Sequence, residues 1–111
     1  MKKIVIILLV FVFIINACSK ESVDYTPDCT VTKTFAADAF PVIQAYCATS
    51  GCHASGSSNG PGALTTYTEI YNARSSVRAA VADGSMPQNG SLTNEQKDAI
   101  LCWIDAGAAN N

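Results

Sequence analysis

Beyond its N-terminal segment, the chain has very few large apolar side chains, and this scarcity limits the folds open to it. Residues 18–111 contain 12 Val, Ile and Leu residues and 2 Phe, which is 14 of 94. At that fraction a chain can fail to fold unaided. Small domains with a weak core usually depend on disulfides, a metal or a large cofactor. We therefore expect one small domain whose core is supplemented in one of these ways.

The N-terminal segment has the pattern of an export signal. It begins with the basic sequence MKK, and residues 4–15 form an unbroken apolar run of 12 residues. That run is shorter than the roughly 20 residues of a spanning helix and suits the core of a signal peptide. The sequence Ile-Asn-Ala before Cys18 resembles a bacterial lipobox. This resemblance implies cleavage before Cys18 and lipid chains on that cysteine, whereas an ordinary secretory signal would leave Cys18 without a role.

These features divide the chain into three predicted regions. We expect a lipoprotein signal peptide at 1–17, a lipid anchor and polar tether at 18–30, and one domain at 31–111. The expected location is the cell envelope, and Ser19 rather than Asp after Cys18 favours the outer membrane, in its periplasmic or surface leaflet. Without Lys2 and Lys3 the chain keeps 5 basic and 9 acidic side chains, a formal charge of −4. A nucleic-acid partner is not expected, because the sequence has no basic patch.

Two cysteines and a histidine lie close together in the segment CATSGCH, from Cys47 to His53. Two thiols followed at once by a histidine are typical of a covalent haem anchor, whose usual spacing is C-x-x-C-H; here four residues separate Cys47 from Cys52. His53 is the only histidine in the chain, and Met86 is the only methionine after residue 17. A c-type haem iron takes one His and often one Met. We therefore predict one covalent haem c bound by Cys47, Cys52, His53 and Met86, the last two on the iron.

The five cysteines leave three accounts open. In the first, Cys18 is lipidated, Cys47 and Cys52 hold haem, and Cys29 pairs with Cys102, as disulfides persist in exported proteins. A Cys29–Cys102 bond would contribute up to about 4 kcal/mol in the chain-entropy model. In the second, Cys47 also pairs with Cys52, and no haem is bound. In the third, these two thiols and the adjacent histidine bind zinc, although structural zinc usually takes four protein ligands.

Caps and apolar spacing predict three helices. Pro41 suits the first turn of a short helix, and the capping boxes TYTE and TNEQ open two longer ones. Gly84 is expected to end the second helix in a left-handed cap. Between the helices, residues 54–62 and 84–90 are loops by composition, and we assign no role to the first of them. The predicted helices are 41–47, 66–82 and 93–106; the stretch 31–40 has no clear assignment.

Two segments resemble small bacterial cytochrome c domains, in particular the planctomycete-type group. One runs from FAADAFPVI at 35–43 to Cys52-His53, and the other joins Met86-Pro87 to WIDAGA at 103–108. Together they cover about half of residues 18–111. The resemblance implies an all-α, cytochrome c-like fold of three to four short helices around one covalent haem. It also implies thioethers at both cysteines of the motif, with His53 as proximal and Met86 as distal ligand.

The expected function is that of a lipid-anchored monohaem cytochrome that transfers electrons to and from a redox partner protein. Such partners dock through small, weak interfaces. We expect no enzymatic activity, because the sequence offers no second histidine and no Ser/His/Asp set. The alternative is a haem-free, disulfide-stapled surface lipoprotein that serves as an interaction module.

Overall fold

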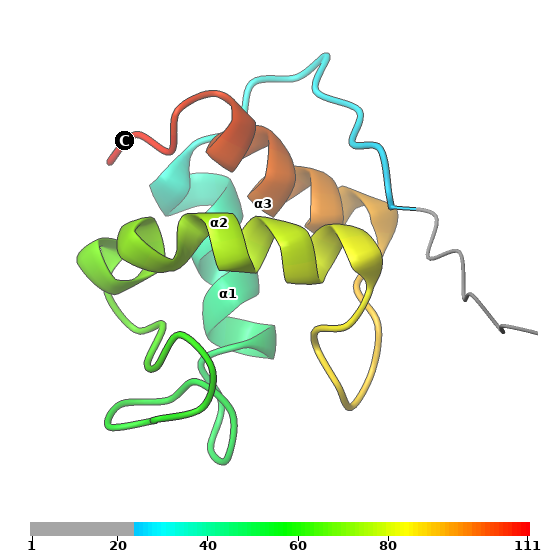
Figure 1. Cartoon of the computed structure of the whole chain (residues 1–111). Coiled ribbons are helices and arrows are strands. Elements are labelled where there is room, and N and C mark those ends of the chain that lie inside the picture. The colour runs from blue at the N-terminus through cyan, green and yellow to red at the C-terminus, as the bar shows by residue number, and fades with distance from the viewer. Residues whose placement is uncertain (1–23) are drawn as a thin grey trace, which may run out of the picture.

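The computed structural model describes residues 24–111, which form helices joined by loops and contain no strand (Figure 1). This confirms the all-α prediction. The predicted signal peptide at 1–17 and the lipidation site Cys18 lie outside the described residues. Within residues 24–111, no helix is both long enough and apolar enough to cross a membrane. The elements are a π-helical turn η1 (Phe35–Ala39), α1 (Phe40–Tyr46), α2 (Tyr67–Asp83) and α3 (Asn94–Asp105).

Both long helices begin at the predicted capping boxes. The Thr66 side chain accepts a hydrogen bond from the Glu69 N–H, and the Glu69 carboxylate accepts one from the Thr66 N–H. Thr93 and Gln96 make the same reciprocal pair at the start of α3. Gly84, with φ of +78°, ends α2 in the left-handed conformation that glycine adopts without strain. These ends determine where the two long loops of the domain begin and finish.

The stretch before α1, which the sequence left unassigned, becomes helical at Phe35. The Thr34 hydroxyl accepts a hydrogen bond from the Ala37 N–H, and Asp38 Oδ2 accepts one from the Thr34 N–H at 2.8 Å. The turn η1 then continues directly into α1. It buries Phe35, whose ring lies 5.0 Å from that of Phe40 and 5.2 Å from that of Trp103 on α3. Packing against a distant helix therefore stabilises this turn.

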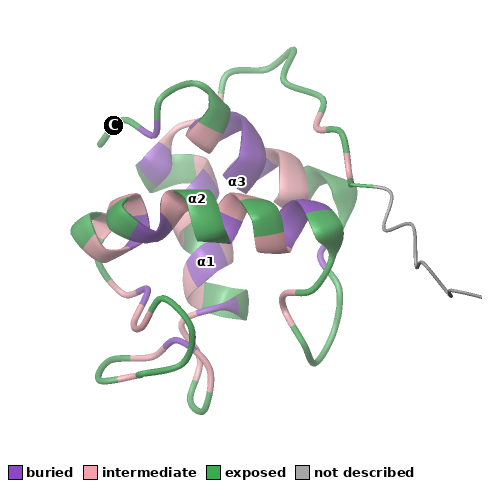
Figure 2. Cartoon of the chain, in the orientation of Figure 1, coloured by how far each residue is buried: buried purple, intermediate pink, exposed green. Residues whose placement is uncertain are grey.

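The core lies between the helices, each of which buries one side and exposes the other (Figure 2). Trp103 anchors it, with its indole N–H donating to the Ala109 carbonyl at 2.8 Å. The C-terminal residues fold back over this tryptophan, since the Ala108 N–H also donates to the Trp103 carbonyl. The largest fully buried side chains are Trp103, Ile43, Ile70, Ile100 and Leu101.

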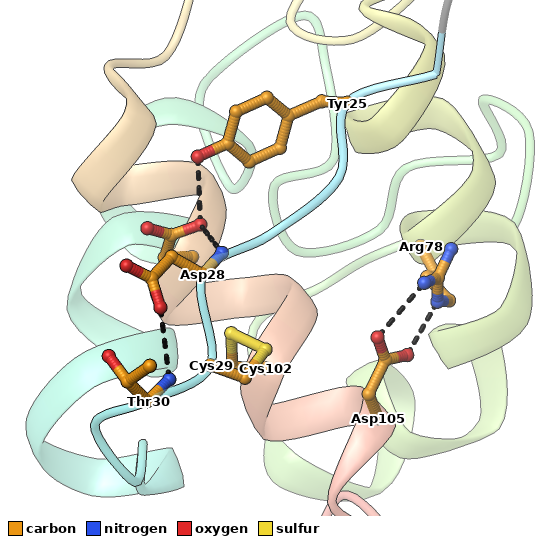
Figure 3. Close-up of a disulfide and its surroundings, with 8 residues drawn as sticks. Tyr25, Asp28, Cys29, Thr30, Arg78, Cys102 and Asp105 are labelled. Carbon is orange, nitrogen blue, oxygen red and sulfur yellow. Dashed lines mark hydrogen bonds and ion pairs between the residues drawn. A yellow bond between two sulfur atoms is a disulfide. The ribbon is translucent and has the colours of Figure 1, made fainter.

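A strap formed by residues 24–30 lies across α2 and α3, although the sequence placed these residues in the tether (Figure 3). Its Cys29 forms a disulfide with Cys102 of α3, with the Cα atoms 5.3 Å apart, which is the pairing that the first and second accounts of the cysteines share. Farther along the same face, Arg78 and Asp105 form a two-pronged ion pair between α2 and α3. The disulfide joins α3 to the strap, and the ion pair joins α3 to α2.

Candidate functional site

Two long loops bring the predicted site residues together. Loop 47–66 joins α1 to α2, loop 84–93 joins α2 to α3, and both leave the same side of the helices (Figure 1). A cavity of about 710 Å³ lies between them. Cofactor sites commonly measure roughly 300–1,000 Å³. The residues that line this cavity include Cys47, Cys52, His53 and Met86.

A second, smaller hollow of about 150 Å³ shares Cys47, His53 and Met86 with the first and extends to α2. Its wall against α2 is apolar, whereas the lining of the larger cavity mixes polar and apolar side chains. Among residues 24–111, no Asp, Glu, Lys or Arg lines either hollow. The apolar wall of the smaller hollow includes Pro61, Leu64, Val77, Ala80 and Val81, and the polar side chains of the larger cavity include Thr49, Ser50, Asn59, Gln88, Asn89 and Ser91.

His53 is buried, with 7% of its surface exposed, and it lines both hollows. Its Nδ1 lies 2.8 Å from the Gly62 carbonyl oxygen. Because a carbonyl only accepts, Nδ1 carries the proton and the Nε2 lone pair is free. Within residues 24–111 Nε2 has no hydrogen-bond partner, and because no side-chain nitrogen there is fully buried without one, Nε2 keeps some exposed surface. Metal-binding histidines almost always have such a second partner for their other ring nitrogen.

The long gap between the cysteines is closed by a turn. The Cys52 N–H donates to the Thr49 carbonyl, and Gly51 between them has φ of +81°. This turn absorbs the additional residues, because the His53 N–H still donates to the Cys47 carbonyl at 3.0 Å. The C-x4-C-H spacing therefore keeps the first cysteine and the histidine in contact through their backbones.

The loop 54–62, to which the sequence assigned no role, supports the motif. The Asn59 amide donates to the carbonyls of Gly51 and Cys52, at 3.1 and 3.0 Å, and the Ser57 hydroxyl also donates to Cys52. The Gly62 carbonyl holds His53, as described above. Sequence reasoning missed these residues because polar and glycine-rich composition is also what a loop without any function shows.

Cys47 and Cys52 are free thiols, the first buried and the second half-buried. Burial, and next the neighbouring Cys52, raise the pKa of the Cys47 thiol to about 11. The additional disulfide of the second cysteine account is not formed. Within the described part of the chain, no three His, Cys, Asp or Glu side chains come together as a metal-binding group.

Met86 reaches the same cavity from the other loop. It is half-buried, and its N–H donates to the Ala80 carbonyl in the last turn of α2 at 3.2 Å. Gly84, two residues before Met86, ends that helix. Met86 and His53 thus belong to separate loops and line the same two hollows. The structure brings together all four residues that the sequence selected.

No known protein family, curated protein or solved structure matches this chain. The case for a function therefore depends on the residues of the site. A buried imidazole with one nitrogen held and the other free, a thioether, two unpaired thiols and an apolar wall make a donor set that fits one covalently held haem.

Proposed function

We propose that this protein is a cytochrome c-like electron carrier that holds one haem in the cavity between loops 47–66 and 84–93. The observation that carries the proposal is the convergence of Cys47, Cys52, His53 and Met86 on one cavity. These four residues were predicted from residue type and spacing alone, and they come from two loops separated by the whole of α2. A convergence of this kind has no evident structural purpose, since Met86 is only half-buried and Cys52 is unpaired.

The two thiols would attach the group. Each adds across one vinyl double bond, so that sulfur bonds to one carbon, the thiol hydrogen passes to the other, and no oxidant is consumed. Cys47 provides a buried attachment point and Cys52 a more exposed one. A haem in the 710 Å³ cavity, set against the apolar wall of the adjoining smaller hollow, would supply the large buried surface that the aliphatic-poor chain lacks.

His53 and Met86 would hold the iron. The Nε2 lone pair of His53 is free to bind iron because Gly62 holds the opposite nitrogen, and this hydrogen bond also makes the imidazole a stronger donor. The thioether of Met86 is a soft ligand that raises the reduction potential. When bound, the haem supplies one-electron redox chemistry. Because two side chains of the chain itself would hold the iron, we propose electron transfer rather than catalysis.

A redox partner protein would dock at the larger cavity, which no Asp, Glu, Lys or Arg of residues 24–111 lines. Tyr46 is 41% exposed there, and its hydroxyl accepts a hydrogen bond from the Gln96 amide on α3. Electron-transfer encounters use small interfaces of this kind, below about 1,200 Å². A lipid on Cys18 would keep the domain at the cell envelope, where such a partner would be found.

The test is to produce the full chain in cells that possess haem-attachment machinery, beside a variant with Cys47→Ser and Cys52→Ser. The wild type should show a Soret band and retain haem on a denaturing gel, and the double variant should lose the retained haem. A second double variant, Cys29→Ser with Cys102→Ser, is the control, because it removes two disulfide-bonded cysteines outside the cavity and should keep the haem. A colourless wild-type protein would instead favour the haem-free interaction module.

A further inference from the structure

Tyr25 ties together the two helices between which the Met86 loop runs. Its backbone N–H donates to the Ala82 carbonyl at 2.7 Å, at the end of α2. Its hydroxyl donates to Asp98 Oδ1 at 2.9 Å, on the first half of α3 (Figure 3). Loop 84–93 begins immediately after α2 and leads into α3. One residue of the strap therefore bridges the two stems of this loop.

The end of α2 links the strap and the loop directly. The last four carbonyls of a helix have no partner within it and must find one elsewhere. Here the Ala80 carbonyl accepts from the Met86 N–H, and the Ala82 carbonyl accepts from the Tyr25 N–H. The two bonds lie two residues apart on the same helical turn. A shift of the strap would therefore move the turn of α2 to which the Met86 backbone is hydrogen-bonded.

Further contacts hold Tyr25 in this position. The Lys97 ammonium lies 4.8 Å from the centre of the Tyr25 ring, and the Asp28 N–H donates to the same Asp98 oxygen as the Tyr25 hydroxyl. The Cys29–Cys102 disulfide fixes the far end of the strap to α3. Tyr25 itself packs against the edge of the core and lines neither hollow. Any influence on the cavity must act through the loop.

We propose that Tyr25 is a positioning residue for Met86: it sets the spacing between the end of α2 and α3 and so keeps the thioether facing the cavity. The part of this inference that concerns iron ligation rests on the proposed haem function. The part that concerns the loop does not, because the hydrogen bonds that carry it are formed by the chain alone.

The test compares Tyr25→Phe with Tyr67→Phe in the full chain. Both variants remove one hydroxyl that donates a 2.9 Å hydrogen bond, but the Tyr67 bond goes to the Ala108 carbonyl, away from loop 84–93. We expect Tyr25→Phe to speed hydrogen exchange at the Met86 amide by roughly tenfold relative to Tyr67→Phe. Asp98→Ala, which removes the acceptor, should act in the same direction if Tyr25→Phe does not fold.

In the haem-loaded protein, Tyr25→Phe should also lose the weak sulfur-to-iron charge-transfer band at a lower pH than either the wild type or Tyr67→Phe. Equal Met86 amide exchange in the two variants would overturn the proposal. If the wild type holds no haem, the band is missing throughout and the proposed function fails. The amide exchange of Met86 would still decide whether Tyr25 positions the loop.

Discussion

The imidazole Nδ1 of His53 and the carbonyl oxygen of Gly62 lie 2.8 Å apart, and this bond leaves Nε2 without a hydrogen-bond partner among residues 24–111, on a side chain that lines the cavity. The backbone of Gly62 aims the carbonyl with φ of +92°, a conformation that L side chains rarely adopt. The orientation of the one histidine thus depends on the backbone of one glycine.

Gly62→Ala should therefore disturb the histidine as well as the loop. The strained conformation should lower the free energy of unfolding by about 1 kcal/mol. In the haem-loaded protein, a weaker hydrogen bond at Nδ1 makes the imidazole a poorer donor and should raise the reduction potential. Gly56→Ala is the control, since Gly56 has φ of +79° and open space around its Cα. Equal potentials in the two variants would contradict the role given to Gly62.

The buried thiol of Cys47 predicts a pH dependence of the haem-free protein. Burial raises its pKa from 9.0 to about 11, so folding favours the protonated form. The stability contributed by this group is fully present below about pH 9 and is lost as the pH rises through 11. The midpoint temperature of thermal unfolding should fall more steeply over this pH window for the wild type than for Cys47→Ala. Haem attachment should abolish the difference, because a thioether has no proton to lose.

Met86→Ala tests the distal ligand. We expect loss of the sulfur-to-iron charge-transfer band and a fall in potential on the order of 0.1 V, within the range of about 0.8 V that axial ligands cover. The matched control is Gln88→Ala, in the same loop and lining the same cavity. A band that persists in Met86→Ala, measured by absorption of the oxidised protein, would show that another group binds the iron.

The Cys29–Cys102 disulfide closes a separation of 73 residues. Replacing both cysteines by serine should cost about 4 kcal/mol in the chain-entropy model. The urea midpoint measures this loss. Arg78→Ala removes the ion pair with Asp105, whose two side chains are 41% and 36% exposed, and should cost less than about 1 kcal/mol. Similar midpoints for the two variants would show that the disulfide adds little to the fold.

The elements that the sequence predicts well are those with local causes. Thr66 and Thr93 begin helices because each is followed three residues later by a Glu or Gln that completes a capping box, and the structure shows both reciprocal pairs. The turn η1 has no such signature. It depends on Phe35 packing against Trp103, far away in the chain, and no local pattern reports a contact of that kind.

The same division holds at the site. Cys47, Cys52, His53 and Met86 were identified from residue type and rarity, and they do line one cavity. Their supports were not identified. Gly62 acts through a backbone carbonyl, which every residue possesses, and the position of Tyr25 is determined by partners on two helices. Residue identity therefore predicts which side chains line the cavity but not which groups hold them in position.

The proposed function requires that Cys47 and Cys52 hold one haem despite their four-residue gap. The most direct measurement is a pyridine haemochrome spectrum of protein made with a haem-attachment system, combined with its intact mass after acid–acetone extraction. We predict a c-type spectrum and a chain heavier by one haem, with the added mass on the peptide that contains residues 47–53. An unmodified mass, with these two cysteines free or joined to each other, would contradict it.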